Sequence, residues 1–150
     1  MTGAAGAAHD RRMDAPPHTP GASHPPSASH TRLARGHAAE ELAVGHLTAR
    51  GITVLARNIR CRGGEIDILC LDGPFLAVIE VRQRARRQFG GALASVTPAK
   101  QRKIIRAARY VLQTSQDLRH RLMRFDVIAI DGLPQGVHEI AWIKDAFRAG

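Results

Sequence analysis

Residues 64–82 read GEIDILCLDGPFLAVIEVR, and this stretch indicates the centre of the fold. It holds two runs of apolar, strand-forming residues, one on each side of the dipeptide Asp72-Gly73. Asp-Gly between two such runs is a strong signal for a tight turn. The stretch therefore predicts an antiparallel hairpin, with strands over residues 65–71 and 75–82.

Acidic side chains interrupt both of these apolar runs. A two-residue turn at 72–73 places Glu65 opposite Glu80, with Asp67 on the diagonal. Since side chains alternate between the two faces of a strand, the hairpin gathers four charged groups on one face: Glu65, Asp67, Glu80 and Arg82. Three clustered carboxylates repel one another unless a cation lies between them. Hard divalent ions bind carboxylate oxygens and keep waters for substrate phosphates, so the pattern predicts a site for Mg²⁺ (or Mn²⁺).

The charge of the chain is unevenly distributed. Its formal net charge is +9 over 150 residues, and residues 1–31 are neutral because their Arg and Asp residues balance. That stretch is rich in Ala, Gly, Pro, Ser and His without an apolar period, which predicts a disordered tail. Residues 32–150 then form one domain that carries the whole positive excess. Such a domain is expected to bind a polyanion, either nucleic acid or an anionic membrane surface; the alternative is a basic surface that only keeps the protein in solution.

Signals for other compartments are absent from the sequence. No run approaches the ~18 apolar residues that cross a membrane, and the first residues lack the apolar core of a secretory signal. Two cysteines, Cys61 and Cys70, make neither a disulfide framework nor a metal-ligand set. We therefore expect a cytoplasmic protein without a membrane partner.

The remaining elements follow from periodicity and from stop signals. We expect a helix over 33–50 ended by Gly51, a short strand over 52–56, a Gly- and Arg-bearing loop over 83–96, a helix over 98–115 started by Thr97-Pro98, and strands over 125–130 and 137–143, the last one near an edge. Together with the hairpin, this order predicts a mixed β-sheet flanked by helices, of the α/β or α+β kind.

The helix over 98–115 is expected to have two different faces. Ile104, Ala108 and Val111 belong to the face toward the core. Like charges line another side, and an anionic partner would offset their mutual repulsion, so we favour a phosphate-contacting ridge over a solvated face. With the preceding loop, the candidate nucleic-acid contacts are Arg84, Arg86, Arg87, Lys100, Arg102, Lys103, Arg106 and Arg109.

Five short motifs occur in a characteristic order: Arg57-Asn58, Gly63 to Asp67, Glu80 to Arg84, Val96 to Gln101, and Arg124 to Val127. In this order they resemble the YraN family over about residues 35–145. The resemblance implies the restriction-endonuclease-like, or PD-(D/E)xK, nuclease fold, which is related to archaeal Holliday junction resolvases.

The resemblance also implies roles for particular residues. It makes Asp67 and Glu80 metal ligands, together with the main-chain carbonyl of Val81 and an acid on the first helix, Glu40. Periodicity alone leaves open whether Glu40 leans toward the hairpin or is an ordinary solvated carboxylate. The implied catalytic set is Asp67, Glu80, Arg82, Glu40 and Gln83.

One position departs from the family pattern, since Arg82 stands where the superfamily has Lys. Arginine keeps its proton at any workable pH and cannot act as a base. Lys100, at the start of the basic helix, is a candidate substitute for that lysine.

The leading hypothesis is therefore a metal-dependent endonuclease that acts on DNA. The resolvase likeness alone suggests a branched substrate and a homodimer. One alternative is a non-catalytic DNA- or RNA-binding module on a nuclease scaffold. Another is purely structural: Glu80 and Arg82 would form a salt-bridge network, and the other hairpin acids would pair with Arg57, Arg60 or Arg62. For Asp126 we expect a structural partnership with a nearby Arg.

Overall fold

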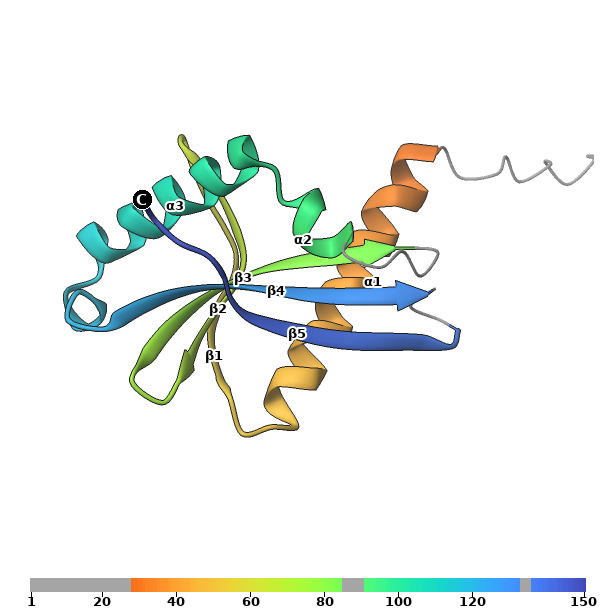
Figure 1. Ribbon diagram of the computed structural model, residues 1–150, viewed down its shortest axis with the longest axis horizontal. Helices are drawn as coiled ribbons and strands as arrows, with labels where there is room; N and C mark the ends of the chain where they lie inside the picture. The colour runs from red at the N-terminus through yellow and green to blue at the C-terminus, as the bar shows by residue number, and fades with distance from the viewer. Residues whose placement is uncertain (1–27, 85–90, 133–135) are drawn as a thin grey trace, which may run out of the picture.

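The computed structural model describes residues 28–84, 91–132 and 136–150. Most of the expected tail, residues 1–27, lies outside these ranges, as do Arg86 and Arg87. The elements follow one another as α1 (Ala28–Thr48), β1 (Thr53–Cys61), β2 (Gly64–Asp72), β3 (Phe75–Arg84), α2 (Gly91–Ser95), α3 (Pro98–Thr114), a 3-10 turn (Gln116–Leu118), β4 (Leu122–Gly132) and β5 (His138–Phe147) (Figure 1).

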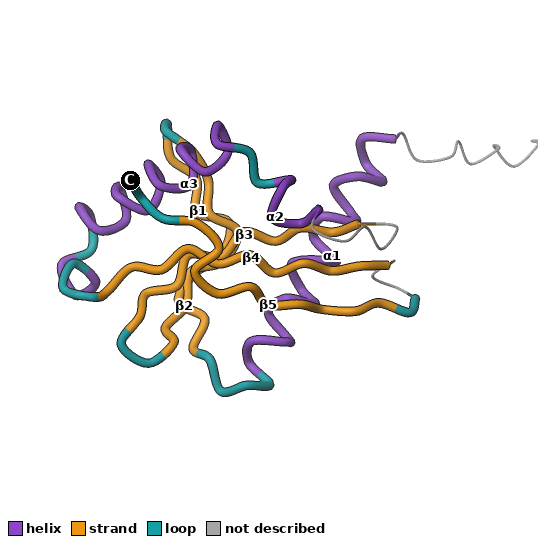
Figure 2. Tube along the Cα trace, viewed as in Figure 1, coloured by secondary structure: helices purple, strands orange, loops and turns teal. Residues whose placement is uncertain are grey.

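The strands form one mixed sheet in the order β1-β2-β3-β4-β5. β3 and β4 run parallel, and the other neighbours run antiparallel. Helices α1 and α3 lie on different sides of the sheet (Figures 1 and 2). This is an α/β fold, as the sequence predicted, and it is consistent with a restriction-endonuclease-like core. Within the described ranges, every helix is too short or too polar to cross a membrane.

Each helix buries an apolar stripe against its own face of the sheet. On the α1 side, Ala39, Ala43 and Leu47 pack among strand residues such as Ile79 and Ile128. On the α3 side, the cluster joins helix residues to residues of β2, β3 and β4: Ile104, Ala107, Ala108 and Val111 with Ile66, Leu69, Val78 and Val127. Because the sheet is covered on both faces, its central strands are apolar almost throughout.

The β2–β3 hairpin is present, but its turn lies one residue later than expected. Asp72 pairs with Phe75, so the turn consists of Gly73 and Pro74, and Gly73 has a φ of 58°. The predicted pairing of Glu65 with Glu80 is therefore wrong. Proline has no N–H for a ladder hydrogen bond, which favours its position in the turn. The register moves by two residues, and Glu65 and Glu80 still meet, because the Lys100 ammonium contacts both carboxylates.

Helix α1 and strand β1 run longer than the sequence indicated, as do β4 and β5. Helix α1 begins at Ala28, five residues before the expected start, and its end is marked by Gly51 at a φ of 74°. Strand β1 continues past Ala56 to Cys61. Its second half contains Asn58 at a φ of 50°, and this left-handed residue breaks the regular alternation that would have revealed a strand. β5 is an edge strand, as expected.

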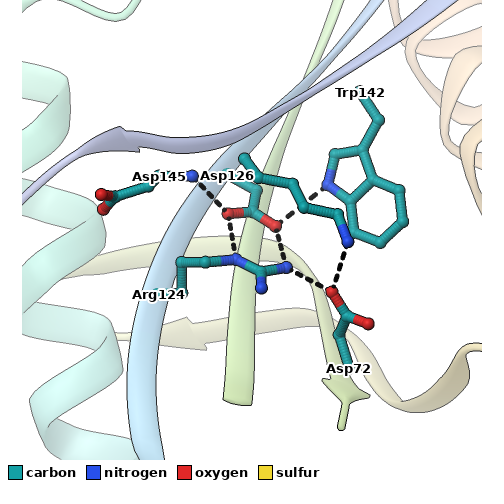
Figure 3. Close-up of polar contacts among 6 residues, drawn as sticks. Asp72, Arg124, Asp126, Trp142 and Asp145 are labelled. Carbon is teal, nitrogen blue, oxygen red and sulfur yellow. Dashed lines mark hydrogen bonds and ion pairs between the residues drawn. The ribbon is translucent and has the colours of Figure 1, made fainter.

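A buried ion-pair network joins the end of β2, the start of β4 and the second half of β5 (Figure 3). Asp126 is fully buried and accepts hydrogen bonds from Arg124 Nε (2.9 Å) and Nη2 (2.8 Å), Trp142 Nε1 (3.0 Å) and the Asp145 main-chain N–H (3.0 Å). Arg124 Nη2 also contacts Asp72 at 2.7 Å, which in turn accepts from a lysine of β5. The expected partnership of Asp126 with an arginine is confirmed.

Helix α3 lies unusually close to the start of β2. A Cβ atom at Gly64 would overlap the main-chain carbonyl of Lys103. Glycine at this position therefore sets how near the helix approaches the sheet.

Gly64→Ala should destabilise the protein by about 1–3 kcal/mol, because the added methyl group pushes α3 off β2. Urea unfolding followed by circular dichroism measures this change. Gly45→Ala is the matched control, since Gly45 lies in α1 with open space around it. There alanine should stabilise the helix by about 0.5–1 kcal/mol. Equal effects of the two substitutions would contradict the close approach of α3.

Asp126→Asn should cost about 3–5 kcal/mol, because it removes the charge of the carboxylate that binds the buried Arg124 guanidinium at two nitrogens, Nε and Nη2. Trp142 is the single tryptophan, so its fluorescence reports unfolding from within the network. Replacing both charges, as in Arg124→Met with Asp126→Leu, should recover much of the loss. Asp117→Asn, at an exposed site, serves as the control. A loss below 1 kcal/mol would show that the pair does not hold the strands.

Candidate metal and nucleic-acid site

The candidate site lies where strands β2 and β3 separate. Their ladder ends at the pair Ile68 and Ile79. One residue further along, the Asp67 carboxylate accepts a hydrogen bond from the Val81 main-chain N–H, with Oδ2 at 2.8 Å from the nitrogen. The side chain thus binds a donor that lies just beyond the last rung of the ladder, and the strands separate around it.

Glu80 is a carboxylate in the interior of the protein, with only 3% of its surface exposed. Its Oε1 lies 3.2 Å from Arg82 Nη2 and 3.4 Å from Lys100 Nζ. Its Oε2 is buried and has no hydrogen-bond partner among the described residues. Burial, with the neighbouring Asp67 charge, raises the pKa of Glu80 to about 7. The carboxyl group is therefore partly protonated near neutral pH.

Asp67 shares this environment. Burial raises the pKa of Asp67, and the charges of Glu40 and Glu65 act in the same direction. The Val81 hydrogen bond and the positive charge of Lys100 oppose the shift without cancelling it. A buried and a partly buried acid with raised pKa values, next to each other, are an arrangement more typical of functional sites than of plain structural ion pairs.

Lys100 enters the site from the first turn of α3, where Thr97 caps the helix. Its Nζ donates to Glu65 Oε1 at 2.8 Å and faces Glu80. Burial disfavours the ammonium ion, but the hydrogen bond to Glu65 and the charge of Glu80 outweigh it, so the pKa of Lys100 is raised. The structure thus brings Lys100 into the cluster, in contact with Glu65 and Glu80.

Glu40 approaches the same cluster from α1, on the other side of the sheet. It is half-buried, and its Oε2 accepts a hydrogen bond from Asn58 Nδ2 at 2.9 Å. Its side chain therefore points toward β1, and its charge also acts on Asp67. Sequence reasoning did not assign Asn58 to the site. The sequence feature that could have identified it is an Asn within a strand. Asn tolerates the left-handed conformation, which here directs its side chain toward α1.

Several candidate residues lie elsewhere. The Gln83 amide donates to the Gly132 main-chain carbonyl at 3.0 Å, on the opposite face of β3 from Glu80. Arg57 pairs with Glu41 at 2.6 Å rather than with a hairpin acid. The Arg84 guanidinium lies against Gly91. The remaining basic candidates on α3 are exposed to solvent: Arg102, Lys103, Arg106 and Arg109.

The donor set is small for a metal ion. Among the described residues, no three His, Cys, Asp or Glu side chains are grouped as a ligand set. Mg²⁺ commonly uses one or two carboxylates and completes its shell with water and substrate phosphates. Asp67 and the unpartnered Oε2 of Glu80 fit that mode of binding, with Glu40 available at longer range.

Comparison with known proteins places this site in a family. Residues 39–130 match the Uncharacterised protein family UPF0102. Among relatives, a UPF0102 protein of Dechloromonas aromatica is 47% identical over 122 residues, covering 81% of this chain and 95% of that protein. One from Alkalilimnicola ehrlichii is 44% identical, covering 83% and 94%, and one from Ralstonia pickettii is 48% identical, covering 76% and 90%. The matched range contains Glu40, Asp67, Glu80 and Lys100, and the chain belongs to the UPF0102 (YraN) family.

Proposed function

We propose that this protein is a metal-dependent endonuclease that hydrolyses phosphodiester bonds of DNA. One observation carries the proposal: Glu80 is buried, has a carboxylate oxygen without a partner among the described residues, and lies beside a second, partly buried acid, Asp67. An ionised pair of this kind is costly unless a cation joins it. The basic surface around it suits a polyanionic substrate.

The carboxylates of Asp67 and Glu80 would hold the ion, helped by Glu40 and the main-chain carbonyl of Val81. When bound, a divalent ion activates water and neutralises charge on a phosphate. Asn58 fixes the orientation of Glu40 through its 2.9 Å hydrogen bond.

Lys100 would supply positive charge next to the reacting phosphate. Its ammonium group already contacts Glu65 and faces Glu80, so it can exchange a carboxylate for a phosphate oxygen without leaving the site. Arg82 cannot take up a proton and is therefore assigned only an electrostatic role.

A DNA-binding module without turnover is the second candidate. It is favoured by the contacts of Arg82 and Lys100 with Glu80 Oε1, at 3.2 and 3.4 Å. These two cations already offset much of the charge that would attract a metal ion.

Cleavage assays distinguish the two functions. With Mg²⁺ or Mn²⁺, the wild type should nick labelled DNA, and Asp67→Asn and Glu80→Gln should each lower the rate at least about 10²-fold, a loss typical of removing an electrostatic catalytic group. Four-way junction, flap and linear duplex DNA are compared in parallel.

Three further variants sharpen this test. Arg82→Lys should cleave faster than the wild type, and Lys100→Met more slowly. Glu41→Gln is the control, because Glu41 is an exposed acid of α1 that pairs with Arg57 away from the cluster. Salt-sensitive DNA binding with no cleavage by any of the variants would leave only the DNA-binding module.

Metal binding should also be visible in stability, with a defined pH dependence. The pKa of Glu80 is about 7 in the folded protein and ordinarily 4.5, so in EDTA the native state keeps a proton that the unfolded chain releases. Stability should then fall as pH rises from about 4.5 to above 7, by on the order of 2–3 kcal/mol. Mg²⁺ or Mn²⁺ should restore it at pH 8.

The measurement is the midpoint of thermal unfolding, first without metal and then at metal concentrations that rise in roughly tenfold steps. The metal-induced rise should be larger at pH 8 than at pH 5.5, because the ion must compete with the proton on Glu80. Glu80→Gln should be more stable than the wild type at pH 8 in EDTA and should lose the metal effect, whereas Glu41→Gln should keep it. An equal rise in the unfolding midpoint at both pH values would contradict the assignment of Glu80 as a metal ligand.

A further inference from the structure

An open groove lies beside the candidate site, between the β1–β2 turn and the first half of α3. Its volume is about 450 Å³, which is within the range of sites that hold small molecules, ~300–1,000 Å³. The residues that line it and carry charge are Arg60, Arg62, Glu65, Lys100, Lys103 and Arg106.

The groove is strongly positive. Lys100 is engaged with Glu65 at 2.8 Å. The other four basic side chains are exposed, and within the described ranges no ion pair neutralises any of them. Four like charges around one hollow repel one another, and an anion between them would relieve the repulsion.

Part of the groove wall is bare main chain. Gly63 and Gly64 form the turn end that faces α3, and a Cβ at Gly63 would come within 3.2 Å of Arg106 Cβ. Side chains at these positions would crowd the helix and narrow the hollow. The two glycines thus allow α3 to approach the turn closely and set the width of the hollow.

The groove is continuous with the acidic cluster. Glu65 and Lys100 line it, and the same Lys100 ammonium faces Glu80 at 3.4 Å. A ligand in the groove therefore ends next to the carboxylates that we assign to the metal.

We propose that this groove is a phosphate subsite, which holds the sugar–phosphate backbone of the DNA strand next to the bond that is cleaved. The inference rests on the proposed nuclease function and deepens it, since it assigns the strand path and two residues, Arg60 and Arg62, that the sequence left out of the contact set. Most of the side chains that line the groove are charged, so they would contact phosphates and position a strand without reading its bases.

The first test is DNA binding in EDTA, where cleavage plays no part. Fluorescence anisotropy with a labelled duplex, repeated over a salt series, gives the slope of log affinity against log salt. The variant is Arg62→Gln with Lys103→Gln. Its slope should be shallower by about 1–2, and its affinity at low salt at least about tenfold weaker, because each lost phosphate contact removes about one unit of slope.

The matched control removes the same charge elsewhere, by Arg35→Gln with Arg119→Gln. Both residues are exposed and neither lines the groove. Equal losses in the two double variants would overturn the subsite, since they would reflect net charge alone. Inorganic phosphate and an unlabelled oligonucleotide are then compared as competitors. If inorganic phosphate competes as strongly per phosphate group, the subsite is overturned, because the groove then binds free anions rather than a strand.

The second test separates the subsite from the nuclease function. Bis(4-nitrophenyl) phosphate offers a single phosphodiester that is too small to fill the groove. An oligonucleotide, in contrast, can reach the groove and the acidic cluster at the same time. In the groove variant, kcat/KM should fall at least about tenfold more for the oligonucleotide than for the small diester. A proportional fall for both overturns the subsite. If the wild type hydrolyses neither with metal, the nuclease proposal fails while the binding test still decides the groove; no DNA binding by the wild type overturns both.

Discussion

The burial of one carboxylate, that of Glu80 on β3, constrains the whole site. A charge with 3% exposure inside an apolar sheet requires nearby cations, and the protein brings them from its own strand, with Arg82, and from α3, with Lys100. Lys100 can reach this position only because α3 packs against the glycine at the start of β2. Helix placement, charge compensation and the open groove are thus consequences of one requirement.

Two buried acids on the β3–β4 ladder show how the same chemistry serves different ends. Glu80 and Asp126 lie one rung apart, since Ile79 pairs with Asp126 and Glu80 with Val127. They project to opposite faces. Both oxygens of Asp126 are occupied, by arginine, indole and main-chain donors, whereas Glu80 keeps one oxygen empty. Complete satisfaction marks a structural acid, and incomplete satisfaction marks the one that we assign to function.

Local patterns in the sequence were enough for the hairpin, the cap of α3 and the arginine partner of Asp126, because each depends on neighbours within a few residues. The predicted turn at Asp72-Gly73 was wrong, because Pro74 has no N–H for the ladder and lies in the turn instead. Asn58 and the basic residues of β1 were missed because their roles depend on α1 and α3, which lie far from them in the chain. Tertiary placement of this kind leaves no period in the sequence.

The parallel pairing of β3 with β4 also bears on the order in which the protein folds. β1, β2 and β3 are joined by short turns and can associate locally, whereas β4 pairs only after a long connection that includes α3 has closed. Contacts between distant segments form late, since loop closure must precede them. If the three-stranded meander forms first, Glu80 would stay hydrated in it at little cost. The arrival of α3 and β4 would then remove water and deliver the Lys100 ammonium together, so that desolvation and neutralisation coincide.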